Sequence, residues 1–242
     1  MEKYDISSFE KGLAALNIKL SDGQIRQFLR YYEMLVEWNQ VMNLTAITEM
    51  TEVVTKHFVD SLSLKKAVSD LEDKPRKIMD VGTGAGFPGI PLKIAFPRLE
   101  ITLLDSLNKR IRFLDAVIEK LELKCIKAVH GRAEDYGRDG KYREQYDLCV
   151  SRAVANLSTL SEYCLPFVKT GGYFIPYKSG KVEEELAAAS GAVKKLGSEV
   201  ERTEDFLLPN GDERTLVVIR KNKVLEKRYP RKAGLPGKDP LK

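Results

Sequence analysis

A run of closely spaced glycines between two apolar segments constrains the fold of this chain more than any other feature. Residues 78–91 read Ile-Met-Asp-Val-Gly-Thr-Gly-Ala-Gly-Phe-Pro-Gly-Ile-Pro. The apolar run at the start is typical of a buried strand, and the apolar spacing at the end is typical of a helix. Glycines at this density let the backbone adopt positive φ and approach a ligand closely. Because free N–H groups at a helix start favour an acceptor or a negative group, the stretch predicts a strand–loop–helix unit for a nucleotide-like ligand.

Two cofactor classes are compatible with this loop. Residues 84–89 have the Gly-x-Gly-x-x-Gly spacing of a dinucleotide fingerprint, and Asp105 follows about twenty residues on. Residues 80–86, Asp-x-Gly-x-Gly-x-Gly, instead resemble motif I of the class I S-adenosylmethionine (SAM) methyltransferases. In that motif the glycines pass under the methionine part of SAM, and an acidic residue ending the next strand holds the ribose. Asp105 meets both requirements, so the loop alone leaves both cofactors open, together with a purely structural turn.

Composition indicates a soluble globular protein. The chain has 242 residues, 31% charged and 43% hydrophobic, enough for one large domain or a main domain with an appendage. No apolar run approaches the roughly 20 residues of a membrane span. The first residues are polar and lack the apolar core of a signal peptide, so we expect a cytoplasmic protein without membrane contact.

The cysteines and histidines argue against a metal centre. Cys125, Cys149 and Cys164 lie in apolar strand or helix patterns without a C-x-x-C motif, which predicts buried, reduced thiols. His57 and His130 are the two histidines of the sequence, so a zinc site is not expected. We interpret His57 as a hydrogen-bonded histidine between two parts of the protein.

Positive charge is concentrated at the C-terminal end. Residues 220–242 contain nine basic and two acidic residues, a net +7 in a chain whose total is +5, so the remainder carries −2. A basic tail on a nearly neutral body indicates a polyanionic partner, although a solubilising tail has the same composition. Arg228, Arg231 and Lys232 are candidate RNA contacts there, since they lie among an aromatic residue and prolines suited to RNA.

The first 74 residues are predicted to be a helical extension. Ser21 and Gln24 form a capping box, and apolar residues at helical spacing continue over 25–36. A connector over 43–48 precedes a further helix over about 49–66. Pro75 marks the boundary with the next unit.

From Lys77 the pattern alternates strand and helix. Strands are predicted over 77–81, 100–105, 125–130, 146–151 and 173–177, the last after a turn at 171–172, with helices ending at 95 and over 108–121, 156–167 and 182–196. Two closing strands, 199–208 and 214–220, flank a turn at 209–212. This order predicts a parallel, doubly wound α/β sheet with ligand at the carboxyl ends of its strands. The closing hairpin must add one antiparallel strand, which is the mark of a class I methyltransferase and favours SAM. We therefore expect a core over 75–222 and a basic tail over 223–242.

The end of the fourth strand indicates the target atom. Residues 151–153, Ser-Arg-Ala, lack the Asp/Asn-Pro-Pro-Tyr/Phe motif of exocyclic-amine methylation, and Cys149 lacks the preceding proline of cytosine-C5 enzymes. A ring nitrogen such as guanine N7 has an in-plane lone pair and needs neither a covalent nucleophile nor a base. Catalysis would then be mostly positioning. Arg152 could donate to guanine O6, orient the cofactor carboxylate or form a structural ion pair.

Two other segments are candidates for ligand contact. After the third strand come residues 131–135, which in the methyltransferase architecture would flank an adenine. A backbone N–H of Ala133 or Glu134 could read its edge; a plain acidic turn is the alternative. Lys109 and Arg110 open the helix after the second strand and are candidate phosphate contacts, or else a solvated basic face.

Seven segments together carry a family resemblance. They are residues 43–47, 57–62, 80–92, 104–110, 131–134, 151–153 and 228–236. In this order they closely resemble the RsmG/GidB family, bacterial methyltransferases that modify guanine N7 in 16S ribosomal RNA. The stretches Gly-Phe-Pro-Gly-Ile-Pro (86–91) and Arg-Tyr-Pro-Arg-Lys (228–232) are far more specific than the glycine loop, and the resemblance covers nearly the whole chain.

The resemblance implies a Rossmann-like class I SAM methyltransferase with an N-terminal helical extension. It assigns cofactor contacts to Gly82 and Phe87, loop shape to Gly84 and Gly86, the ribose to Asp105 and Ser106, the adenine to Ala133 and Glu134, and the meeting point of cofactor and base to Arg152. It identifies no catalytic acid or base. The expected partner of a monomeric enzyme is 16S rRNA or the small ribosomal subunit, with naked, partly assembled and finished forms all open. A nicotinamide-dependent oxidoreductase and a non-catalytic, SAM-binding assembly factor are the alternatives.

Overall fold

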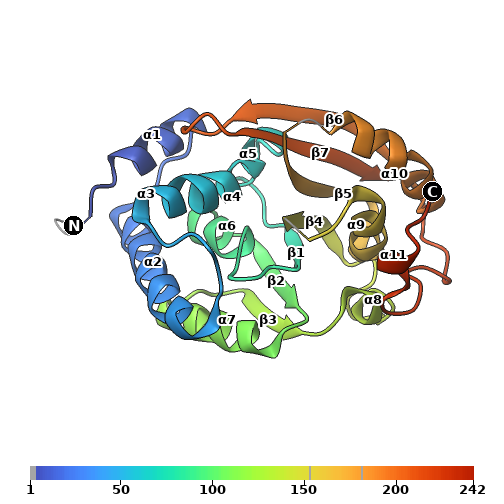
Figure 1. Ribbon diagram of the computed structural model, residues 1–242, viewed down its shortest axis with the longest axis horizontal. Coiled ribbons are helices and arrows are strands. Elements are labelled where there is room, and N and C mark those ends of the chain that lie inside the picture. The colour runs from blue at the N-terminus through green and yellow to red at the C-terminus, as the bar shows by residue number, and fades with distance from the viewer. Residues whose placement is uncertain (1–3, 153, 181) are drawn as a thin grey trace.

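The alternation of strands and helices predicted from residue 77 onward is present in the computed structural model, which describes residues 4–152, 154–180 and 182–242 (Figure 1). Within these residues, one sheet has the strand order β3-β2-β1-β4-β5-β7-β6. Its strands are β1 (Lys77–Val81), β2 (Glu100–Asp105), β3 (Ile126–His130), β4 (Tyr146–Arg152), β5 (Val168–Ser179), β6 (Ser198–Leu207) and β7 (Glu213–Lys221). The first five run parallel, and β7 is antiparallel to β5 and β6. The predicted seven-stranded α/β sheet with one antiparallel strand is confirmed.

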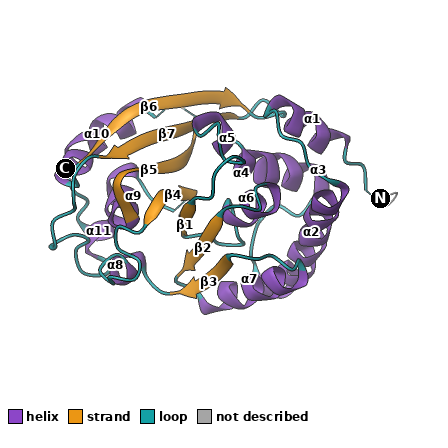
Figure 2. Cartoon of the chain, turned by 180° about the vertical axis from the view of Figure 1, so that it is seen from behind, coloured by secondary structure: helices purple, strands orange, loops and turns teal. Residues whose placement is uncertain are grey.

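Helices cover both faces of the sheet. On one face lie the N-terminal helices α1 (Ser7–Ala15), α2 (Asp22–Met42), α3 (Met50–Val53), α4 (Asp60–Leu62) and α5 (Leu64–Ala67), with α6 (Gly89–Ala95) and α7 (Asn108–Lys120). On the other face lie α9 (Leu157–Cys164), the 3₁₀ turn η2 (Leu165–Phe167) and α10 (Glu183–Lys195). Two short helices, α8 (Ala133–Tyr136) and α11 (Leu235–Lys238), lie near α9 (Figure 2). The apolar core is therefore two layers separated by the sheet.

The N-terminal helices share the core of the sheet. The predicted capping box of Ser21 and Gln24 is present at the start of α2. The Gln24 amide also donates to the Ile94 carbonyl at 2.7 Å, so the same side chain caps the end of α6. Phe28 and Phe58 pack at 5.0 Å between ring centroids. Burial of these rings explains why the extension folds against the sheet.

The helix predicted over residues 49–66 is interrupted. Between α3 and α4 the chain forms a π-helical segment, η1 (Val54–Val59). The Ser61 and Ser63 hydroxyls donate to the carbonyls of His57 and Asp60. Such bonds compete with the i→i−4 ladder, which accounts for the irregular turns. Wide turns of this kind recur at functional sites, and η1 carries His57.

Two further predictions need correction. The fifth strand begins at Val168 rather than at residue 173, because Gly171 and Gly172 form a bulge inside β5 instead of a turn before it. A Cβ at Gly172 would lie 2.6 Å from the Asp147 carbonyl, so the bulge requires glycine. Cys125 was expected to be buried, but it precedes β3 with φ of +54° and is exposed. Cys149 and Cys164 are buried free thiols, as predicted.

The C-terminal segment, residues 222–242, packs against the face covered by α9. Leu225 and Tyr229 are buried in that apolar layer. The Arg143 guanidinium donates to the carbonyls of Gly137, Leu225, Glu226 and Tyr229. The segment is thus held by the core through backbone contacts. Among the described helices, none is long and apolar enough to cross a membrane.

Candidate cofactor site

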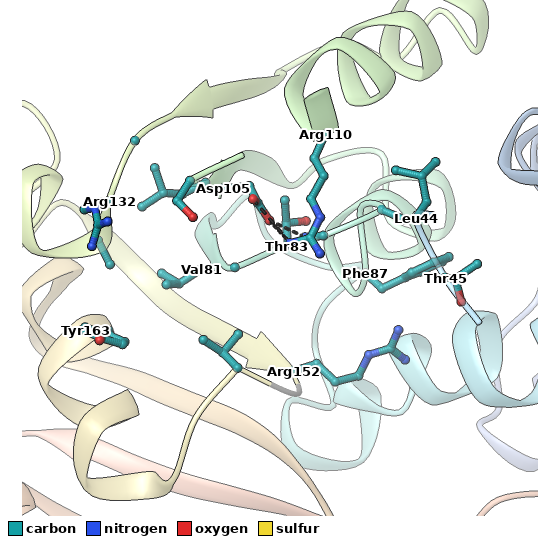
Figure 3. Close-up of a pocket in the computed structure, with 18 of the residues that line it drawn as sticks. Leu44, Thr45, Val81, Thr83, Phe87, Asp105, Arg110, Arg132, Arg152 and Tyr163 are labelled. Carbon is teal, nitrogen blue, oxygen red and sulfur yellow. Dashed lines mark hydrogen bonds and ion pairs between the residues drawn. The ribbon is translucent and has the colours of Figure 1, made fainter. Parts of the chain in front are cut away.

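A cavity of about 520 Å³, the first cavity, opens at the carboxyl edge of the parallel strands (Figure 3). Its wall comes from the ends of β1, β2 and β4, the β3–α8 connection and the N-terminal connector. Lining residues include Leu44, Thr45, His57, Gly82, Gly84, Phe87, Leu104, Asp105, Ser106, Arg110, Arg132, Ala133, Glu134, Arg152, Val154 and Tyr163. This is the position at which open α/β sheets bind ligands, and the volume is typical of a small-molecule site.

The glycine-rich loop forms the floor of the first cavity. Gly82, Gly84 and Gly86 have φ of +70°, +62° and +100°, a region that other residues enter at a cost. A Cβ at Gly82 would lie 2.5 Å from a methyl carbon of Val154, which also lines the cavity. Gly86 does not line it, and a Cβ there would meet Ile90 at 2.5 Å. Glycine at both positions therefore permits close packing, against Val154 in the cavity wall at Gly82 and against Ile90 behind the loop at Gly86.

Asp80 holds the loop from below. Its Oδ2 accepts hydrogen bonds from the Thr83 hydroxyl at 2.7 Å and the Gly89 N–H at 2.9 Å, which joins the loop to the start of α6. The side chain is fully buried, and this burial raises the pKa of Asp80 to about 7. Oδ1 of Asp80 has no partner among the described residues. Asp80 is absent from the cavity wall, so its role is to shape the loop.

Asp105 lies at the end of β2, where it meets the loop. Its carboxylate accepts from the Gly84 N–H at 2.9 Å and the Leu107 N–H at 2.9 Å. The Arg110 guanidinium donates to the same carboxylate at 3.1 Å and lines the first cavity (Figure 3). Lys109 instead donates to the Met42 carbonyl at the end of α2, at 2.8 Å. The two adjacent cations thus have different environments, one inside the cavity and one at the junction with α2.

Arg152 closes one end of the cavity. Its Nη1 donates to Asp60 Oδ2 at 2.6 Å and to the Lys56 carbonyl at 3.0 Å, and its guanidinium lies 5.1 Å from the ring centre of Phe87. Asp60 is nearly fully buried, so its ion pair with Arg152 holds the guanidinium in one position. Ala153, the next residue of the predicted target-facing segment, lies outside the described residues.

His57 lies beside Arg152, whose Nη2 is 3.2 Å from His57 Nδ1. Its ring lies 4.4 Å from that of Phe87, and its Nε2 is 3.0 Å from the Thr45 hydroxyl. Burial and the nearby Arg152 charge lower the pKa of His57 to about 4, so the ring is neutral at pH 7. His57 is hydrogen-bonded to Thr45 and stacks on Phe87 of the glycine-rich loop, so it is a hydrogen-bonded histidine between two parts of the protein, as expected. The sequence did not predict that His57 and Thr45 also line the cavity, because both are far from the loop in the sequence.

The opposite end of the first cavity lies at the β3–α8 connection. Ala133 and Glu134 open α8, and Arg132 and Tyr163 lie beside them, away from Arg152 (Figure 3). The Glu134 carboxylate is buried and accepts from the backbone N–H of Gly234 at 2.8 Å. It therefore ties this end of the cavity to the C-terminal segment.

The three tail cations are not equivalent. Arg228 is exposed and pairs with the exposed Glu226 at 2.9 Å, and Lys232 is exposed. Arg231 instead donates to the fully buried Glu162 at 2.8 Å and to Asp239 at 3.3 Å. Its guanidinium is thus committed to protein carboxylates, which argues against Arg231 as an RNA contact.

The structure brings most predicted cofactor residues together. Gly82, Gly84, Phe87, Asp105, Ser106, Ala133, Glu134 and Arg152 all line the first cavity. The prediction from sequence missed Leu44, Thr45, Leu104, Arg132, Val154 and Tyr163 as parts of its wall. In the described part of the chain, no group of three or more His, Cys, Asp or Glu residues could hold a metal ion.

The chain is similar to known rRNA small subunit methyltransferases. The model of the GidB family, described as rRNA small subunit methyltransferase G, matches residues 24–217. The chain is 56% identical over 238 residues to the ribosomal RNA small subunit methyltransferase G of Lachnoclostridium phytofermentans, covering 98% of each chain. It is 52% identical to the protein of that name from Alkaliphilus oremlandii, covering all of both.

Solved structures share the fold at low identity. The TYW2 protein of M. jannaschii in complex with AdoMet aligns with a TM-score of 0.53 and 13% identity, over 68% of this chain and 77% of that one. TrmN from Thermus thermophilus aligns with a TM-score of 0.50 and 14% identity, over 69% and 53%.

Proposed function

The chain belongs to the GidB family of small-subunit rRNA methyltransferases, and from this premise we propose that it transfers a methyl group from SAM to N7 of a guanine in 16S rRNA. One observation carries the proposal. The glycine-rich loop, the acidic end of β2 and the arginine at the end of β4 converge on one cavity at the carboxyl edge of the sheet.

The residues of the first cavity fit SAM. Gly82 lines the cavity without a side chain, and Asp105 offers carboxylate oxygens suited to ribose hydroxyls. Ala133 and Glu134 present backbone at the end where an adenine would lie, and Arg152 provides a cation at the other end. When bound, SAM supplies an electrophilic methyl group on a positively charged sulfur.

The side chains around Arg152 are suited to positioning rather than to proton transfer. Guanine N7 attacks with its own lone pair, so no base has to remove a proton first. His57 is neutral and hydrogen-bonded to Thr45, and Arg152 is held by Asp60. A fixed guanidinium can donate to an acceptor such as guanine O6 and keep the base in line. We identify no acid or base among these residues.

The same premise disfavours the two alternatives. A nicotinamide-dependent oxidoreductase is not favoured by the family or by the antiparallel β7. A non-catalytic assembly factor is not favoured by relatives named as methyltransferases. We further propose a cytoplasmic monomer that acts on 16S rRNA within or outside the small subunit. In this enzyme, residues 1–74 support the cavity and residues 75–222 form the catalytic core. The exposed cations Lys109, Arg228 and Lys232 approach the RNA.

The deciding experiment measures methyl transfer directly. Purified protein is incubated with methyl-labelled SAM and unmodified small-subunit rRNA, offered naked and as assembled subunits, and the nucleosides are then analysed by mass spectrometry. We expect label in 7-methylguanosine. Label in another nucleoside would exclude N7 as the target, and SAM binding without transfer to either substrate would support the assembly-factor alternative.

A further inference from the structure

A second cavity of about 450 Å³ adjoins the first one. It is lined by Ile47, Lys56, His57, Asp60, Arg152, Ala155, Tyr177, Lys178, Ser179, Glu185 and Arg214. His57 and Arg152 also line the first cavity, so these two side chains form the boundary between the cavities. A group at the boundary can therefore meet molecules in both.

The strand order explains why the second cavity faces the same edge as the first. The first cavity lies over the ends of β1, β2 and β4, whereas the second lies over the ends of β4 and β5 and the start of β7. Because β7 is antiparallel, its first residues, including Arg214, lie beside the last residues of β5, including Ser179. The hairpin at the end of the chain thus brings a cation to the catalytic edge.

The lining of the second cavity is rich in positive charge. In the wall itself, Lys56, Arg152, Lys178 and Arg214 contribute four cations against the carboxylates of Asp60 and Glu185. Asp60 is shared between two of them, with Oδ2 at 2.6 Å from Arg152 and Oδ1 at 3.2 Å from Arg214. Outside the wall, the more exposed Glu52 and Asp212 pair with Lys56 and Arg214 at 2.6 and 3.5 Å. An excess of cations in a concave site attracts an anion such as phosphate.

Two of these cations have donors left for a ligand. The Lys178 ammonium donates to the Ala155 carbonyl at 3.1 Å and to Glu185 at 2.7 Å, which uses two of its three N–H groups. Lys56 pairs with the half-exposed Glu52 at 2.6 Å, an arrangement that is weak in water. Neither residue lines the first cavity, so neither is needed for cofactor contact.

We propose that the second cavity holds the target nucleotide of the RNA, with its base at the Arg152–His57 boundary and phosphates against Lys56, Lys178 and Arg214. The inference rests on the proposed function, since it places the RNA that receives the methyl group. The cavity is within the size range of nucleotide-sized ligands. A base that enters here reaches the first cavity at the boundary that His57 and Arg152 form.

The test compares substitutions of the second-cavity cations with a control on the same strand. Arg214→Gln and Lys178→Gln, alone and together, are compared with Arg220→Gln, which changes an exposed arginine near the other end of β7. Steady-state kinetics with the unmodified small subunit give KM and kcat, and calorimetry gives SAM affinity. We expect each single change to raise the RNA KM about tenfold, with SAM affinity within twofold of wild type and Arg220→Gln without effect.

The salt dependence of RNA affinity gives a second measurement. Each lost phosphate contact reduces the slope of log affinity against log salt by about 0.7–0.9. Lys56→Gln leaves buried groups unchanged and so tests the cavity even if Arg214→Gln folds poorly. Unchanged RNA KM and salt slope in Lys56→Gln and Lys178→Gln, while wild type is active, would overturn the second cavity as the RNA site, as would a comparable loss of SAM affinity. Wild type that is inactive on both the subunit and naked rRNA would instead reject the proposed function.

Discussion

The buried Glu134 carboxylate accepts a 2.8 Å hydrogen bond from the backbone N–H of Gly234, a residue one hundred positions further along the chain. Glu134 stands at the end of the first cavity where an adenine would lie, and Gly234 belongs to the C-terminal segment. This bond links the cofactor site directly to the chain that follows the core. The C-terminal segment is therefore part of the support of the cavity as well as a carrier of positive charge.

Glu134→Ala should lower the free energy of unfolding by about 1.5–3 kcal/mol, because it removes a charge-assisted bond and leaves the Gly234 N–H without its partner. It should also weaken SAM binding, since the α8 backbone loses its anchor. Denaturant unfolding and calorimetry measure the two effects. Asp135→Ala, an exposed neighbour, serves as control and should change stability by less than about 0.5 kcal/mol. Equal stability of the two variants would contradict this role of Glu134.

Substitution of Arg231 and of Arg228 should have different effects, because we expect Arg231 to have a structural role and Arg228 an RNA-binding role. Arg231→Ala leaves the fully buried Glu162 charge unpaired and should cost about 3–5 kcal/mol of unfolding free energy. Arg228→Ala removes an exposed side chain, so stability should hardly change while the salt dependence of RNA binding becomes shallower. Unfolding and RNA-binding titrations on both variants check this. A stable Arg231→Ala protein with reduced RNA affinity would show that Arg231 is an RNA contact after all.

The succession of strands along the chain, the glycine-rich loop and its acidic partner Asp105 could be predicted, because each depends on a local sequence pattern. Asp80, the alternating glycines and Asp105 lie at fixed places in one strand–loop–helix–strand unit, and their positions follow from periodicity alone. The closing strands also follow from local pattern, since the turn at 209–212 allows an antiparallel pair. The bulge at Gly171 could not be distinguished from a turn, because both use glycine.

The contacts between distant segments could not be predicted from the same patterns. His57 and Thr45 line the first cavity because α2 and η1 pack against the sheet, and periodicity does not specify that docking. Arg231 was grouped with exposed cations by composition, although its partner Glu162 lies on α9. A buried pair of this kind depends on two residues 69 positions apart. Charge content shows neither which cations are exposed nor which are paired.

Gly82→Arg should abolish SAM binding while the fold is retained. The backbone at Gly82 has φ of +70°, and even a Cβ would approach Val154 to 2.5 Å, so an arginine must occupy the first cavity. Calorimetric titration with SAM measures the loss. The matched control is Gly140→Arg, where a Cβ has no neighbour within 4 Å and binding should be unaffected. Full SAM affinity in Gly82→Arg would remove this cavity as the cofactor site.

Asp80 should make stability depend on pH in a direction opposite to that of an ordinary paired carboxylate. Burial raises the pKa of Asp80 from 3.8 to about 7, so the folded protein holds a proton that the unfolded chain releases. The resulting stabilisation is fully present below pH 3.8 and is lost as the pH rises through about 7. Thr83 and Gly89 both donate to Oδ2, so asparagine can keep these two bonds with its carbonyl oxygen.

Asp80→Asn should therefore gain stability relative to wild type as the pH rises from about 4 to about 7 and show a constant difference above that. The slope should not exceed about 1.4 kcal/mol per pH unit, the limit for one proton. Denaturant unfolding of both proteins across this range measures the difference. Asp135→Asn, at an exposed position, should track wild type. A difference between Asp80→Asn and wild type that is independent of pH would mean that Asp80 stays ionised in the folded protein, held by its two donors and by the Arg152 charge.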